Sequence, residues 1–184
     1  LRDIDFSPNG RHLAIASDGG HAVIDVAALP RNKTVNVPPR HSGGTEGPIN
    51  AITYSPDGEW LATAVNGAHG SLRIWDLKAD REIWFQRVGA DTLQFSTDGT
   101  RLLSGDHTTG EMRVWDLTQV RTRRTAETED FDWSSLLSSP THRTWIAHEK
   151  TCYDAVDLGT DGSIVTVGQD GFLRRWKATT ADFR

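Results

Sequence analysis

Residues 70–77 read G-S-L-R-I-W-D-L, and nearly the same phrase returns at 110–117 as G-E-M-R-V-W-D-L and at 171–178 as G-F-L-R-R-W-K-A. In each copy a glycine precedes a short run rich in apolar and aromatic residues, which is typical of a strand that follows a turn. In the first copy this pattern places Leu72 and Ile74 on one face of the strand and Arg73 and Trp75 on the other. A strand that recurs along the chain indicates a repeat architecture.

Two further segments precede each copy of this strand and also precede Ile24-Asp25. The first is an alternating run that closes on Asn-Gly or Asp-Gly: I-D-F-S-P-N-G at 4–10, I-T-Y-S-P-D-G at 52–58, L-Q-F-S-T-D-G at 93–99 and V-D-L-G-T-D-G at 156–162. The second is a short apolar run, which begins at His12, Trp60, Arg101 and Ser163. Asn-Gly and Asp-Gly supply the positive φ angles that tight hairpin turns require. Each unit therefore predicts a three-stranded antiparallel meander.

A fourth, more polar segment follows three of the units: T-V-N-V-P from Thr34, E-I-W-F-Q-R-V from Glu82 and R-T-R-R-T-A-E-T from Arg121. Polar residues suit the outermost strand of a small sheet, because they discourage edge-to-edge association. The inner strands are apolar on both faces, which predicts burial between neighbouring sheets. Four-stranded sheets packed face to face around an axis form a β-propeller.

These residues resemble the WD-repeat β-propeller family. Trp75-Asp76 and Trp115-Asp116 match the dipeptide that names the family, and Ser55-Pro56-Asp57-Gly58 matches its usual first turn. The resemblance implies an all-β fold, a propeller of four-stranded antiparallel blades that forms an incomplete arc of a larger propeller. The expected units are blade 1 at about 1–38, blade 2 at about 48–88, blade 3 at about 90–126 and blade 4 at about 151–178. Residues 127–150 are expected to be either a degenerate repeat or a functional loop.

The resemblance also implies a buried hydrogen-bond chain that stabilises a blade, since the indole N–H of a buried Trp needs an acceptor. In the fourth unit its members are His148, Thr166, Asp170 and Trp176. The other units match it only in part. The second offers Thr63, Trp75, His41 and Asn66; the third offers Ser104, Trp115 and Asp106. Ile24 replaces Trp in the first unit, and Lys177 replaces Asp in the fourth.

Composition narrows the function further. The chain has 184 residues and a formal net charge of −5, which argues against a nucleic-acid-binding surface. Its one cysteine, Cys152, favours a reducing compartment and hence a cytoplasmic protein. No apolar run reaches the roughly 18 residues of a membrane-spanning helix, so no membrane partner is expected. The sequence begins inside a strand-like pattern without Met, which predicts a piece of a longer protein.

No catalytic or metal-binding pattern is evident. The seven histidines are scattered without metal-ligand spacing, and no G-x-S-x-G or phosphate-binding loop occurs. We therefore expect no enzyme activity, no metal and no cofactor.

The sequence thus predicts a non-catalytic protein–protein interaction scaffold. The alternative is a sensor or autoinhibitory repeat region of a larger multidomain signalling ATPase or kinase. The expected partners are proteins or peptides, together with the remaining blades of the same parent chain. Candidate contact residues are Asn50, Asp154 and Gln169, placed by analogy with the rim positions of the family, and Phe131 and Trp133 in the segment before the last unit.

Overall fold

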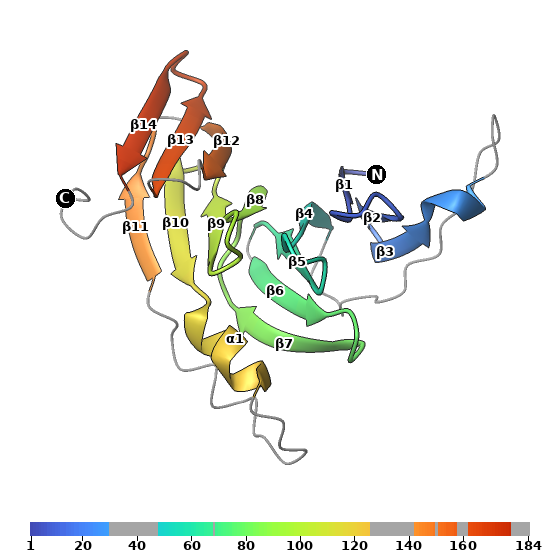
Figure 1. Ribbon diagram of the computed structural model, residues 1–184. Helices are drawn as coiled ribbons and strands as arrows, with labels where there is room; N and C mark the ends of the chain where they lie inside the picture. Colours follow the sequence, from blue (N-terminus) through green and yellow to red (C-terminus); the bar gives the residue numbers. More distant parts are fainter. Residues whose placement is uncertain (30–47, 68, 126–141, 150, 158–161, 178–184) are drawn as a thin grey trace.

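We describe a computed structural model of the chain, which covers residues 1–184 except 30–47, 68, 126–141, 150, 158–161 and 178–184 (Figure 1). The described residues form four antiparallel sheets. Sheet 1 contains β1 (Asp3–Phe6), β2 (His12–Ser17) and β3 (Gly20–Asp25). Sheet 2 contains β4 (Ile49–Tyr54), β5 (Trp60–Val65), β6 (Ser71–Asp76) and β7 (Arg81–Gln86). Sheet 3 contains β8 (Thr92–Phe95), β9 (Arg101–Gly105), β10 (Glu111–Asp116) and β11 (His142–Ile146). Sheet 4 contains β12 (Cys152–Asp157), β13 (Ser163–Gly168) and β14 (Leu173–Lys177).

The sheets follow one another along an open arc, with sheet 1 at one end and sheet 4 at the other (Figure 1). Strands within a sheet are paired in sequence order, as in a meander, and no sheet closes on itself. The all-β propeller-type fold predicted from the repeats is therefore confirmed, in the form of an incomplete arc.

The first turn in each of sheets 1, 2 and 3 is held by its own serine and an acidic or amide residue. In sheet 2, Ser55 Oγ accepts the Trp60 N–H at 2.9 Å and donates to Asp57 Oδ1 at 2.5 Å. Gly58 closes this turn with φ of 73°, a left-handed conformation that glycine adopts without strain. The Ser-Pro-Asp-Gly pattern thus fixes the register of the hairpin, since the side chains satisfy the backbone donors of the turn.

The aspartate that ends each third strand caps the segment after it. Asp76 Oδ1 accepts the N–H groups of Lys78 and Ala79, both at 2.9 Å, and Asp116 Oδ1 accepts the Thr118 N–H at 2.8 Å. Asp25 does the same for the short 3-10 helix η1 (Val26–Ala28). In sheet 4 the equivalent residue is Lys177, which offers no acceptor for such a cap.

One strand prediction is wrong. The segment from Arg121, expected to be the outer strand of the third unit, lies in the helix α1 (Thr118–Thr125). Asp116, two residues before the helix begins, accepts the N–H of its first residue, Thr118, and the Gln and Arg residues that follow are good helix formers. The outer strand of sheet 3 is instead β11, which pairs with β10 so that Trp115 lies opposite His142.

This pairing also decides part of the degenerate-repeat hypothesis for residues 127–150. Residues 142–146 complete sheet 3 and do not form a strand of an additional unit. The extra chain is therefore inserted between the third and fourth strands of sheet 3. Phe131 and Trp133, like the predicted strand from Thr34, lie outside the described residues.

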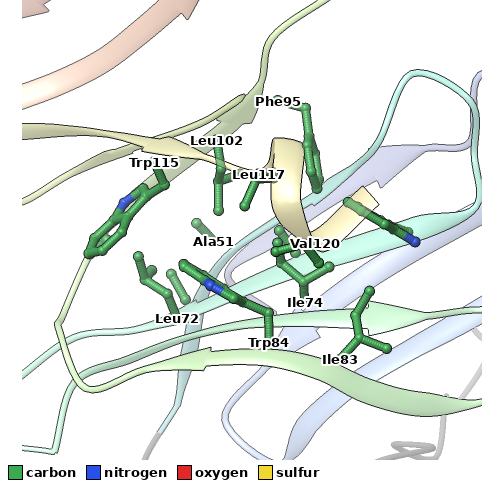
Figure 2. Close-up of a cluster of buried hydrophobic side chains, with 14 residues drawn as sticks. Ala51, Leu72, Ile74, Ile83, Trp84, Phe95, Leu102, Trp115, Leu117 and Val120 are labelled. Atoms are coloured by element: carbon green, nitrogen blue, oxygen red, sulfur yellow. The ribbon is translucent and has the colours of Figure 1, made fainter. Parts of the chain in front are cut away.

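The core consists of three layers of side chains between successive sheets. The largest lies between sheets 2 and 3 and includes Leu72, Ile74 and Trp84 from sheet 2 with Leu102 and Trp115 from sheet 3 (Figure 2). Leu117 and Val120 add the start of α1 to this layer (Figure 2). The rings of Trp84 and Trp115 meet edge to face with centroids 5.5 Å apart. Adjacent sheets are thus joined by burial of apolar surface, which is the main stabilising term in folding.

Candidate partner-binding cleft

The first strand of each sheet lies on the inner side of the arc. These strands, β1, β4, β8 and β12, are neighbours in space, and together they line a cleft of about 510 Å³. Because a first strand has a hydrogen-bonded neighbour on one side only, its other edge offers backbone and side-chain groups to the cleft. This is the surface on which the arc brings together residues that are far apart in the sequence.

Two aspartates of β1 join sheet 1 to sheet 2 beside the cleft. Asp3 Oδ2 accepts the Ile52 N–H at 2.9 Å, and Asp5 Oδ2 accepts the Tyr54 N–H at 2.7 Å. These carboxylates satisfy backbone donors of β4 that have no strand partner on that side. They therefore fix the position of β4 relative to β1.

Asp91 has the corresponding role between sheets 2 and 3. Its carboxylate accepts the side-chain amides of Asn50, at 2.8 Å, and of Asn66, together with the His107 N–H at 2.9 Å. Asn50 and Asn66 come from sheet 2, and His107 comes from the turn between β9 and β10. One partly buried carboxylate thus connects strand β4 with the turns that follow β5 and β9.

His107 also contacts Tyr153 of sheet 4. The His107 ring packs edge to face on Tyr153 with centroids 6.1 Å apart, and its Nε2 lies 3.4 Å from the Tyr153 carbonyl oxygen. The polar contacts therefore run from Asn50 through Asp91 and His107 to Tyr153, across sheets 2, 3 and 4. Such a connected network holds the wall of the cleft in one arrangement.

Of the three contact residues predicted from the rim positions, two line the cleft and one does not. Asn50 and Asp154 line the cleft. Asp154 is exposed, and its Oδ1 accepts the Ala155 N–H at 2.8 Å. Gln169 lies outside the cleft lining, where its N–H bonds to the Thr151 carbonyl at 2.9 Å. Asp91 and His107 were not predicted, although Asp91 stands directly before β8, and Asn50 lies at the start of β4.

The lining of the cleft carries more negative than positive charge. Four carboxylates line it, from Asp3, Asp5, Asp91 and Asp154, against the single guanidinium of Arg2. Apolar groups lie between them, because Ile4, Tyr153 and Val156 are all more than two fifths exposed. The cleft can therefore contact both positive charge and apolar side chains.

The four residues of the implied polar chain meet in sheet 4. The Trp176 indole N–H donates to Thr166 Oγ1 at 2.9 Å, and Thr166 Oγ1 lies 2.9 Å from His148 Nε2. His148 Nδ1 in turn lies 2.9 Å from Asp170 Oδ1. Because Trp can only donate, the Thr166 hydroxyl is free to donate to Nε2, which leaves the His148 proton on Nδ1 toward Asp170.

The ionised form of the Asp170 carboxyl is stabilised by its neighbours. Burial would raise the pKa of its carboxyl, but hydrogen bonds from Arg174, the Phe172 N–H and His148 outweigh this and lower the pKa to about 2. His148 and Thr166 are fully buried, so no substrate reaches them. The arrangement accounts for stability of the sheet and needs no catalytic interpretation.

Among the described residues of sheets 2 and 3, the first bond of such a chain is present. Trp75 donates to Thr63 Oγ1 at 3.1 Å, and Trp115 donates to Ser104 Oγ at 2.9 Å. Asn66 bonds to Asp91 instead, and Asp106 accepts the backbone N–H groups of Thr108 and Thr109. His41 lies outside the described residues.

Trp75 is less buried than Trp115. It lies beside a cavity of about 460 Å³ between sheets 1 and 2, with the His21 ring 5.0 Å from its own. Trp115 is only 2% exposed. The two tryptophans therefore occupy equivalent strand positions with different packing.

An open arc of antiparallel sheets, with first strands on the inside and packed faces between, defines an incomplete β-propeller. A family model described as WD domain, G-beta repeat matches residues 32–76. This range ends on Asp76 of the Trp75-Asp76 pair. The match at residues 32–76 and the antiparallel sheets are together consistent with a WD-repeat fragment, and WD40 repeats in general imply a protein-interaction scaffold. No curated protein matches the chain.

In the described part of the chain no helix is long and apolar enough to cross a membrane. Within the same residues no group of three or more His, Cys, Asp or Glu side chains is arranged to hold a metal ion.

Proposed function

We propose that this protein is a non-catalytic interaction scaffold and that its inner cleft binds an extended, basic segment of a partner protein. The observation that carries the proposal is the lining of the cleft, which contains four carboxylates and three exposed apolar side chains but only one guanidinium, that of Arg2, which pairs with Asp18. Opposite charge steers encounter and selects partners, while apolar contacts supply affinity.

The rigidity of the cleft wall supports the same proposal. Asp3, Asp5 and Asp91 each bond to a neighbouring sheet, so their positions are fixed before a partner arrives. A pre-organised surface loses less entropy on binding. Asp154 differs, because it is exposed and available to a ligand cation.

The free thiol of Cys152 is buried, and burial raises its pKa to about 11. We further propose a reducing, cytoplasmic site of action, because the sequence offers no second cysteine with which Cys152 could form an internal disulfide.

The test is a binding titration with fluorescently labelled peptides. A peptide of alternating arginine and alanine should bind, and its counterpart of glutamate and alanine should not. Asp154→Asn should weaken the arginine peptide by about fivefold, the range of one exposed charge pair. Asp80→Asn is the matched control, since it removes an aspartate outside the cleft at a φ of 51° that Asn also tolerates. Equal binding of both peptides, or equal effects of both variants, would contradict the proposal.

A further inference from the structure

The sequence contains two Asn-Gly pairs, and both lie between paired strands. Asn9-Gly10 connects β1 with β2, and Asn66-Gly67 follows β5. In such a pair the backbone nitrogen of the glycine can attack the asparagine side chain, because no Cβ shields the nitrogen. The contacts of that nitrogen differ between the two pairs.

The Gly10 nitrogen is held away from the side chain of Asn9. Its N–H donates to the Ser7 carbonyl at 2.8 Å, as in a tight turn. Asn9 Oδ1 accepts the Ser7 hydroxyl and the Arg11 N–H, both at 2.9 Å. The nitrogen and the side-chain amide thus bond to different groups, and attack would require this turn to open.

The Gly67 nitrogen, in contrast, contacts the amide that it would attack. The Gly67 N–H donates to Asn66 Oδ1 at 2.7 Å, while Asn66 Nδ2 donates to Asp91 and so holds the amide in position. Gly67 is exposed, and a Cβ built on it would meet no heavy atom within 4 Å, so water can approach. Reacting groups that are held together react faster than groups that must first find one another.

We propose that Asn66 is a deamidation site and that its conversion alters the wall of the inner cleft. Hydroxide removes the proton of the Gly67 N–H, and the nitrogen forms a bond to Asn66 Cγ. The Cγ–Nδ2 bond then breaks, and Nδ2 takes a proton from water and leaves as ammonia. Water opens the resulting cyclic imide at either carbonyl carbon, which gives an aspartate or an isoaspartate at this position. The net reaction consumes one water and releases one ammonia.

The conversion acts on a contact that holds the cleft wall. Asp91 Oδ2 accepts the Asn66 amide and also the His107 N–H, the latter at 2.9 Å. Deamidation replaces the donating amide by a second carboxylate, and two carboxylates in contact repel each other. Asp91 should therefore move away from position 66, and its bond to the His107 N–H should weaken. This effect is a property of the wall itself and does not depend on a partner bound in the cleft.

Peptide mapping by mass spectrometry, during incubation of the chain at mildly alkaline pH, tests the site. In the folded chain we expect Asn66 to convert at least about tenfold faster than Asn9, because only Asn66 is held beside the attacking nitrogen. In urea the two pairs should convert at similar rates, since the turn contacts are lost. A preference for Asn66 that is no larger in the folded than in the unfolded chain would overturn the proposal.

Two variants that make the same chemical change test the effect on the wall. Asn66→Asp should speed hydrogen exchange of the His107 amide severalfold and lower the urea midpoint. Asn9→Asp is the matched control and should do neither, because Asp57 and Asp98 already accept the serine hydroxyl in the equivalent turns of sheets 2 and 3. Unchanged exchange of the His107 amide in Asn66→Asp, or equal effects of the two variants, would contradict the effect on the cleft wall.

Discussion

The guanidinium of Arg121 donates from Nη1 to Asp57 Oδ2 at 2.6 Å, which joins helix α1 to the first turn of sheet 2. The same side chain donates from Nε to the Gly99 carbonyl at 2.6 Å in sheet 3 and lies 4.3 Å above the Trp60 ring. Asp57 has a lowered pKa: burial opposes the shift, and Ser55 and Arg121 provide hydrogen bonds that outweigh it. One helical residue thus connects two sheets, and this helix occupies the part of the chain where a strand was expected.

Replacement of this residue should loosen the boundary between sheets 2 and 3. Arg121→Ala removes one charged hydrogen bond, one bond to a carbonyl and a cation–π contact, and should lower the free energy of unfolding by about 1–2 kcal/mol. Gln119→Ala, on an exposed position of the same helix, should have almost no effect. Urea unfolding of both variants provides the comparison. Equal urea midpoints for the Arg121→Ala and Gln119→Ala variants would show that the Arg121 contacts contribute nothing to stability.

The polar chain of sheet 4 should be more sensitive than its shorter counterpart in sheet 2. Thr166→Val keeps the side-chain volume but leaves the Trp176 N–H and the His148 ring nitrogen without a partner. Buried unsatisfied groups cost about 1–3 kcal/mol each, so we expect a clear loss of stability. Among the described residues, Thr63→Val removes the acceptor of Trp75, and Trp75 is half-buried. In chemical denaturation the Thr63 variant should therefore lose less free energy of unfolding than the Thr166 variant. The reverse order would contradict the stabilising role that we assign to the polar chain of sheet 4.

Acid should weaken the protein through Asp170. The pKa of this carboxyl is about 2 in the folded chain against an ordinary value of 3.8. A lowered pKa means that the contribution to stability is complete above the ordinary value and is lost as the pH falls toward about 2. Asp170→Asn should be less stable than the wild type near neutral pH, and the difference should narrow in that acidic window. Thermal melts from neutral to acidic pH measure it, and a constant difference would contradict the pKa shift.

The two equivalent tryptophans should differ in their cost of truncation. Trp115→Ala opens a cavity in the packed layer between sheets 2 and 3 and should cost about 3–5 kcal/mol. Trp75→Ala should cost less, because Trp75 already borders a cavity and is half-buried. Unfolding free energies of the two variants test this. Equal losses would mean that Trp75 is packed as tightly as Trp115.

The sequence predicted features that depend on local pattern. The hairpins followed from Asn-Gly and Asp-Gly, and the repeated Trp strand indicated the resemblance to WD repeats, because both signals are contained within a few residues. The outer strand of sheet 3 could not be predicted in the same way. Polar residues from Arg121 fit a surface helix as well as an outer strand, and the pairing of β11 with β10 joins segments separated by α1 and the inserted chain.

The cleft was predicted only in part for a similar reason. Asn50 was proposed by analogy with the rim positions of the family, but Asp91 contacts Asn50, Asn66 and His107, which come from three separate segments. Its importance arises from the way adjacent sheets pack. No spacing within a single repeat expresses that relationship.

Backbone amide chemical shifts during titration with the peptide of alternating arginine and alanine test the central claim most directly, because they locate the contact surface. We predict that the largest changes occur in β1, β4, β8 and β12, with Asp154 and its neighbours among the most affected. Changes confined to the outer strands β7 and β11, or changes that the glutamate and alanine peptide reproduces, would contradict the assignment of the inner cleft as the partner-binding surface.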